Sequence, residues 1–238
     1  MFTRILRWSA VMALLASSPV RAADSGGTTV NDIHSQLNAT LVENIVTPTT
    51  IPEIQTVIRN AREQKKAVSI TGGRHAMGGQ QFGAGTILID MSGMNRVVSF
   101  DRHKGLLEVE AGIQWPALVD YLLQAQKDQW PQWGIVQKQT GADRLSIGGA
   151  LSANVHGRGL RLKPFVSDVE SFTLVDAAGK LLACSRTENP ELFRLVAGGY
   201  GLYGVITTVK IRLTQRKKIE RVVQVIALND LMPAFEKR

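Results

Sequence analysis

The most informative segment of this chain is residues 147–159, which read IGGALSANVHGRG. Glycines let a backbone approach a ligand closely and point its N–H groups at anionic oxygens. The residues after Gly148-Gly149 predict a short helix whose N-terminus would attract phosphate through free N–H groups and the helix dipole. The alternative is a glycine-rich turn packed against a strand. Two further glycine clusters, Thr71–Gly79 and Gly198–Gly204, favour the ligand-binding interpretation.

The cluster Thr71–Gly79 directly follows a predicted strand, Ala67–Ile70, at the end of a strand–helix–strand pattern. Ligands of α/β sheets bind beyond the carboxyl ends of strands. Arg74 and His75 add a possible positive charge to the free N–H donors of the small residues around them. The loop is therefore predicted to bind an anion. A flexible turn with a surface histidine is the alternative, because a bare Gly-Gly is a weak signal.

Residues Gly199–Gly204 match the pattern G-x-G-x-x-G of dinucleotide-binding proteins. That fingerprint requires a strand before it and a helix after it. Here a short helix capped by Asn189 is expected before the glycines, and the alternation of Val205–Leu213 predicts a half-buried strand after them. The order is inverted, so a nicotinamide-dependent Rossmann enzyme is the least favoured hypothesis.

The rest of the chain contains mainly strand signals. Leu41–Val46 reads as one strand and is followed by a helix that begins at Pro52, and a second helix begins at Trp115. Further strands are predicted at Thr86–Asp90, Asn95–Phe100, Leu106–Glu110, Val169–Val175 and Leu181–Cys184, the last two as a hairpin.

Composition excludes several classes of protein. The 238 residues suit one large domain or two small ones. A single cysteine, Cys184, excludes an internal disulfide and a cysteine-based zinc site. The histidines show no metal-ligand spacing, so no metal site is expected. The formal net charge is +8, but no aromatic-rich basic motif accompanies it, so nucleic-acid binding is not expected.

The N-terminus has the pattern of a signal peptide. Arg4 and Arg7 precede an apolar run, Trp8–Ala16, which is followed by small residues up to a predicted cut after Ala22. The apolar run is short for a membrane span. Residues 1–22 are therefore expected to direct export to the periplasm or the outside, with no stable membrane insertion. An uncleaved membrane anchor is the alternative. Cleavage would lower the net charge to +5.

Taken together, five segments resemble the FAD-binding (PCMH-type) domain of the vanillyl-alcohol-oxidase group of flavoproteins, which includes the aldonolactone and alditol oxidases. The segments read SITGGRHA (69–76), LIDMS (88–92), EAG (110–112), IGGALSANVHG (147–157) and GGYGLYGVIT (198–207). The resemblance implies an α+β fold of two subdomains, a small α/β part and a larger antiparallel sheet flanked by helices, with FAD between them. It places a flexible lead-in at 23–37, the FAD-binding domain at 38–214 and the start of a substrate domain at 215–238.

The resemblance also implies three groups of cofactor-binding residues. The loop around the pyrophosphate corresponds to Gly72, Gly73, Arg74, His75, Ala76 and Met77. The second phosphate and the flavin-side wall correspond to Gly141, Ala142, Gly148, Gly149, Asn154 and His156. A strand edge corresponds to Gly204, Val205 and Ile206. Some members bind FAD covalently through a histidine near the place of His75, but arginine precedes it here where those members often have glycine, so covalent and non-covalent FAD both remain open.

The function implied by the resemblance is that of an FAD-dependent oxidoreductase. Such an enzyme would oxidise an alcohol carbon of a sugar-, lactone- or hydroxyacid-like small molecule by hydride transfer to flavin N5, and oxygen or another acceptor would reoxidise the flavin. No catalytic base is assigned, because most substrate-contacting groups of the family lie after the FAD domain. The alternative is a flavin-binding module without turnover.

Overall fold

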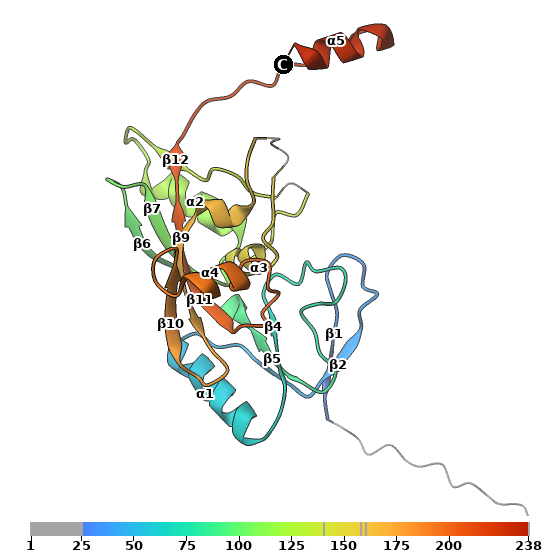
Figure 1. Cartoon of the computed structure of the whole chain (residues 1–238), viewed down its shortest axis with the longest axis vertical. Helices are drawn as coiled ribbons and strands as arrows, with labels where there is room; N and C mark the ends of the chain where they lie inside the picture. The colour runs from blue at the N-terminus through green and yellow to red at the C-terminus, as the bar shows by residue number, and fades with distance from the viewer. Residues whose placement is uncertain (1–25, 140, 158, 160, 238) are drawn as a thin grey trace, which may run out of the picture.

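Two sheets of different kinds organise the chain, with helices packed on their faces (Figure 1). The computed structural model describes residues 26–139, 141–157, 159 and 161–237. The predicted signal peptide, residues 1–22, lies outside these ranges. Within them, no helix combines the length and the apolar character needed to cross a membrane.

The smaller sheet is parallel, with strand order β3-β5-β4. Its elements are β3 (Asn44–Val46), α1 (Ile51–Glu63), β4 (Val68–Thr71) and β5 (Ile87–Asp90). Helix α1 begins after Thr50, whose hydroxyl accepts a hydrogen bond from the Glu53 backbone N–H (3.4 Å). Its buried residues Ile54, Ile58 and Ala61 share one face at helical spacing. This sheet and helix confirm the expected small α/β subdomain.

The larger sheet is antiparallel, with strand order β10-β9-β11-β7-β6. Its strands are β6 (Val97–Asp101), β7 (Leu106–Glu110), β9 (Val169–Val175), β10 (Leu181–Ser185) and β11 (Val205–Arg212). The helices of this part are α2 (Trp115–Ala125), α3 (Ile147–Ser152) and α4 (Pro190–Val196). The predicted hairpin of β9 and β10 is confirmed. Since one hydrophobic core runs from α1 to β11, both sheets belong to the same packed body.

Several short elements complete the fold. They are β1 (Thr28–Val30), β2 (Thr40–Val42), η1 (Met91–Gly93), β8 (Trp133–Gly134), η2 (Phe165–Asp168), β12 (Thr214–Gln215), η3 (Leu228–Asp230) and α5 (Leu231–Glu236). In Figure 1 the chain after β12 extends away from the sheets, and its side chains are exposed. The assignment of 215–238 to a following domain stays a prediction.

The N-terminal region differs from the sequence-based expectation in two ways. The single strand predicted over 41–46 is two strands, because the chain changes sheets at Glu43: β2 pairs with β1, and β3 pairs with β5. The segment expected to be part of a flexible lead-in contains β1, whose Val30 packs with Val42 and Leu88 in a second small core. Burial of these apolar residues accounts for the regular structure found there.

Helix α4 is present as predicted, but the predicted cap is wrong. Asn189 adopts a left-handed backbone conformation (φ 46°) and makes no side-chain cap. Its side-chain amide instead donates to the Ala183 carbonyl of β10 at 2.6 Å. The side chain thus fastens the helix start to the sheet.

Candidate functional site

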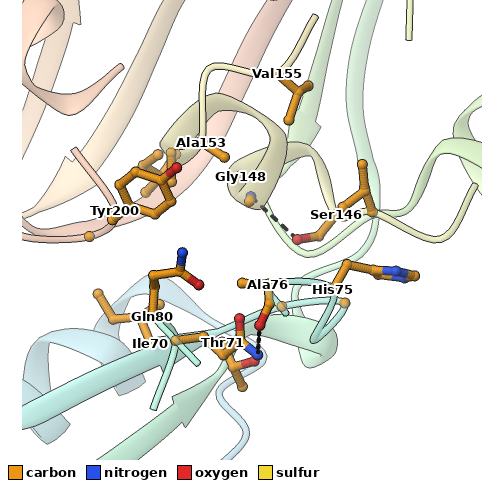
Figure 2. A pocket seen from close by; sticks show the side chains of 18 of the residues that line it. Ile70, Thr71, His75, Ala76, Gln80, Ser146, Gly148, Ala153, Val155 and Tyr200 are labelled. Carbon is orange, nitrogen blue, oxygen red and sulfur yellow. Dashed lines mark hydrogen bonds between the residues drawn. The ribbon is translucent and has the colours of Figure 1, made fainter. Parts of the chain in front are cut away.

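A cavity of about 610 Å³ lies where the two subdomains meet. One wall is the loop after β4, and the opposite wall is α3 with the loop that follows it (Figure 2). The turn before β11 closes a third side through Tyr200, Gly201 and Gly204. The structure therefore brings together the three glycine clusters that lie far apart in the sequence.

Most of the predicted cofactor-binding residues line this cavity. They are Gly72, Gly73, Arg74, His75, Ala76, Met77, Gly148, Gly149, Asn154, His156, Gly204 and Ile206. Three others do not line it. Gly141 and Ala142 lie in the loop before α3, and the side chain of Val205 packs in the core. Val205 pairs with Val175 at the start of β11, so the neighbouring Ile206 presents the side chain on the cavity face.

The loop after β4, residues 72–79, is here called the first loop. Its backbone offers hydrogen-bond donors. The backbone N–H groups from Gly73 to Met77 make no hydrogen bond to another described residue. The loop is held instead through its carbonyls: the Ala76 carbonyl accepts from the Gly79 N–H (3.1 Å) and from the Gln81 side-chain amide (3.2 Å). Unpaired N–H groups in succession form a concave anion site. The prediction of free donors in this loop is confirmed.

The charge of Arg74 is not directed at an anion in the cavity. Its guanidinium forms an ion pair with Asp90 at the end of β5 (Nη2 to Oδ2, 2.9 Å). Its backbone adopts a left-handed conformation (φ 57°), which is strained for a residue with a side chain. The possible positive charge expected at Arg74 is therefore balanced by the carboxylate of Asp90.

The N-terminus of α3 is also occupied, contrary to the expectation of free N–H groups. The Ile147 N–H donates to the Ile113 carbonyl (2.9 Å), and the Gly148 N–H donates to the Ala111 carbonyl (2.7 Å). The Gly149 N–H is capped by the Ser146 hydroxyl at 3.3 Å. These contacts join the helix to the residues that follow β7. Because the N–H groups at the start of α3 are engaged, the first loop is the better site for donating hydrogen bonds to a ligand.

Two glycines allow the walls of the cavity to approach each other. A Cβ at Gly72 would collide with the side chain of Ser146 on the opposite wall. A Cβ at Gly148 would lie 2.8 Å from Cβ of Ala111, closer than such atoms normally come. These glycines are therefore required by the packing around the site.

His75 forms a pair with His34, which lies between β1 and β2. The His75 Nδ1 and His34 Nε2 atoms are 2.6 Å apart, so one proton is shared between them. Burial lowers the pKa of His75 below its ordinary value, the neighbouring His34 lowers it further, and the Arg144 backbone carbonyl acts in the opposite direction. Nε2 of His75 is buried and lacks a well-formed hydrogen bond to another described residue. The ring is directed away from the Tyr200 end of the cavity (Figure 2).

The sequence analysis missed several lining residues: Ile70, Thr71, Gln80, Gln81, Met91, Ala111, Gln139, Leu145, Ser146, Ser152, Ala153, Val155, Gly157, Tyr200 and Gly201. Thr71 and Tyr200 stand inside the glycine clusters, and that position was a usable signal. Thr71 is only 2% exposed, and its hydroxyl has no partner among the described residues. Tyr200 has a left-handed backbone (φ 49°), and its ring faces Ile70 and Gln80 across the cavity (Figure 2). Met91 and Ala111 stand in the family-like segments LIDMS (88–92) and EAG (110–112), which was also a usable signal.

The donor set fits a dinucleotide-like cofactor. The described lining residues include no carboxylate that would repel a diphosphate. The backbone N–H groups from Gly73 to Met77 and the Thr71 hydroxyl, which have no partner among the described residues, can provide hydrogen bonds. Apolar side chains from Ile70, Met91 and Ile206 can flank flat rings.

Comparisons with known proteins agree with this geometry. A family model described as "FAD binding domain" matches residues 42–185. L-gulonolactone oxidase of Mus musculus is 31% identical over 166 residues, covering 69% of this chain and 36% of the relative. Cytokinin dehydrogenase 2 of Arabidopsis thaliana is 31% identical over 179 residues, covering 73% of this chain and 34% of the relative.

A putative D-arabinono-1,4-lactone oxidase of Neurospora crassa is 31% identical, covering 71% of this chain and 29% of the relative. The solved structure of an alkyldihydroxyacetonephosphate synthase superposes with a TM-score of 0.63 at 22% identity, over 75% of this chain and 35% of that one. It shares the fold and confirms the expected α+β architecture. The chain spans about a third of the length of these relatives. It belongs to the FAD binding domain family, and its cofactor is FAD.

Proposed function

We propose that this chain is the FAD-binding part of an oxidoreductase that oxidises an alcohol carbon of a sugar-, lactone- or hydroxyacid-like substrate. The observation that carries the proposal is the row of N–H groups from Gly73 to Met77 that make no hydrogen bond to another described residue. This row borders a cavity of about 610 Å³ lined by no described carboxylate. Lactone oxidases among the relatives support the alcohol-oxidising class. The cytokinin dehydrogenases among them make a cytokinin-like molecule the competing substrate class.

The residues of this chain would bind and orient the cofactor. The N–H groups from Gly73 to Met77 would neutralise the diphosphate, and the Thr71 hydroxyl would add a hydrogen bond from the buried end of β4. Met91 and Ile206 would pack against the rings and exclude water. When bound, FAD supplies the N5 atom that accepts hydride from the substrate carbon.

Covalent attachment of FAD through His75 remains part of the proposal, as one of two modes. In this structure Nδ1 of His75 is engaged by His34, and Nε2 is buried against the protein. Acid precipitation of the FAD-loaded chain distinguishes the modes. Flavin that stays with the precipitate, and is lost from it in His75→Ala, supports attachment, whereas flavin released into the supernatant supports non-covalent binding.

Turnover is tested by anaerobic bleaching of the bound flavin. L-Gulono-1,4-lactone, D-arabinono-1,4-lactone and a cytokinin represent the substrate classes in the names of the relatives. We expect a lactone, or another sugar-like alcohol, to lower the visible absorbance of the oxidised flavin. Bleaching by the cytokinin alone would replace the sugar-like substrate class with a cytokinin-like one. Bleaching by dithionite but by no substrate would favour a flavin-binding module without turnover.

The nicotinamide alternative has little structural support. Helix α4 precedes the G-x-G-x-x-G segment and β11 follows it, which is the reverse of a Rossmann site. That hypothesis expects NADH to quench tryptophan fluorescence without competition from FAD. Competition by FAD would reject it.

We also propose export of the protein, on the sequence pattern of residues 1–22. The mass of the protein recovered from cell fractions tests this proposal. A soluble extracytoplasmic form beginning at Ala23 would support cleavage after Ala22. A membrane-bound form that retains Met1 would support the anchor instead.

A further inference from the structure

A short segment between β1 and β2 lies against the first loop of the cavity. This segment, residues 31–38, is here called the Asp32 turn. It is fastened from inside by the Asp32 carboxylate, which is only 1% exposed although no described cation pairs with it. Its Oδ1 accepts from the His34 N–H (3.0 Å) and the Ser35 N–H (2.6 Å). Its Oδ2 accepts from the Ser35 hydroxyl (2.8 Å) and the Asn38 side-chain amide (2.7 Å).

These hydrogen bonds keep Asp32 ionised. Burial acts to raise the pKa of its carboxyl, but the hydrogen bonds from Asn38 and Ser35 outweigh burial and hold the pKa well below its ordinary value. A buried carboxylate satisfied in this way fixes the conformation of the segment around it. The Asp32 turn is therefore a defined structure, although its sequence is polar.

Three contacts join the turn to the first loop. The Ile33 N–H donates to the Arg74 carbonyl (3.1 Å), and the Asn38 amide donates to the Met77 carbonyl (2.7 Å). The third is the pair of His34 and His75 at 2.6 Å. The contacts made by Ile33 and Asn38 both end on backbone carbonyls of the loop. The N–H groups from Gly73 to Met77 make no hydrogen bond to any residue that the structure describes.

Asn38 is the direct link in this arrangement. Its single amide nitrogen donates both to Asp32 Oδ2 and to the Met77 carbonyl, at 2.7 Å each. Its Oδ1 packs against Gly79, where an added Cβ would lie 3.0 Å away and where φ is 73°. Asn38 therefore contacts the loop at both Met77 and Gly79.

We propose that the Asp32 turn is a positioning element that sets the affinity of the cavity for the diphosphate of FAD. By holding the loop carbonyls on its own side, the turn keeps the loop N–H groups free for the ligand. Asp32 and Asn38 act through the loop and do not line the cavity. Preorganisation of this kind raises affinity by lowering the ordering cost of binding. The inference rests on the proposed binding of FAD between Gly73–Met77 and the opposite wall.

The test compares Asn38→Ala and Asp32→Asn with Leu37→Ala in the full chain. Leu37 lies in the same turn, is 86% exposed and donates only through its backbone. Three quantities are measured: the Kd of FAD by quenching of flavin fluorescence, the melting temperature of the FAD-free chain, and hydrogen exchange of peptides across the chain.

We expect Asn38→Ala to raise the Kd of FAD about tenfold, the effect of losing one or two net hydrogen bonds. The melting temperature should stay close to that of the control, and faster exchange should be confined to residues 31–38 and 72–81. Asp32→Asn should also raise the Kd of FAD. The amide nitrogen of asparagine replaces one carboxylate oxygen and cannot accept the hydrogen bonds that this oxygen receives from the turn.

Two results would overturn this inference and leave the proposed binding of FAD intact. In the first, wild-type chain binds FAD and Asn38→Ala binds it equally well. In the second, both variants melt early and exchange faster throughout, which would make the turn a general stabilising element. Failure of the wild-type chain to bind FAD would instead contradict the proposed function, and the inference with it.

Discussion

The guanidinium of Arg74 lies 2.9 Å from the carboxylate of Asp90, so the only arginine of the first loop points its charge at the protein. Asp90 also caps η1 by accepting from the Ser92 N–H at 3.0 Å. Binding of a diphosphate in the cavity would therefore depend on backbone donors more than on this side chain.

Replacement of Arg74 by glycine tests that relationship. Glycine adopts the left-handed conformation of this position (φ 57°) without strain. This relief of backbone strain offsets the loss of the ion pair with Asp90, because each effect is on the order of 1 kcal/mol. We expect the free energy of unfolding to change by less than about 1 kcal/mol and the Kd of FAD to change less than about threefold. Calorimetric titration measures the second quantity. A loss of about a hundredfold would show that Arg74 contacts the phosphate directly.

Gly72→Ala should destabilise the chain, because its Cβ would collide with the Ser146 side chain. We expect a loss of about 1–3 kcal/mol in the free energy of unfolding, typical of overpacking. The double variant Gly72→Ala/Ser146→Gly should recover part of it, and denaturant unfolding compares the three chains. Equal stability of Gly72→Ala and wild type would show that the walls are further apart than described here.

His75 should make stability depend on pH. Because its folded pKa is lowered, chiefly by burial and then by His34, the unfolded chain binds more protons than the folded chain below about pH 6.5. Stability attributable to this group is therefore complete above that pH and declines as the pH falls toward the folded pKa. Denaturant unfolding from pH 7.5 to 5 should show a smaller decline in His75→Gln. An identical pH dependence in both chains would contradict the assignment.

Cys184 should be unreactive in the folded chain. Burial, and then the nearby Glu188, raise the pKa of this thiol to about 11, and the residue is fully buried in the core. Since the thiolate is the reactive form, Ellman's reagent at pH 8 should label it only after unfolding. Rapid labelling of native protein, at a rate independent of denaturant, would place the thiol at the surface.

The sequence predicted much of the fold because its signals are local. The periodicity of α1, the alternation of β11 and the three glycine clusters each fall within a few residues. The features that the sequence did not predict depend on contacts between segments that lie far apart in the chain. The N–H groups of α3 bond to Ala111 and Ile113 on another segment, so a helix that reads as a free phosphate site has none to offer.

The same reason explains the other misses around the site. The pairing of Arg74 with Asp90 and the contact of Asn38 with Met77 arise only when separate segments meet. The split at Glu43 gave no local signal either, because both halves of 41–46 are good strand sequences and only their partners differ.

The proposed function depends on occupancy by FAD of the cavity beside the first loop. The most direct measurement is the visible spectrum of the purified full chain after incubation with FAD and desalting, run beside Ala76→Asp. Ala76 lines the cavity, so the added carboxylate would repel the diphosphate. We expect wild type to retain a flavin spectrum and a folded Ala76→Asp chain to lose it. A folded but colourless wild type, or equal retention by both chains, would contradict binding of FAD in this cavity.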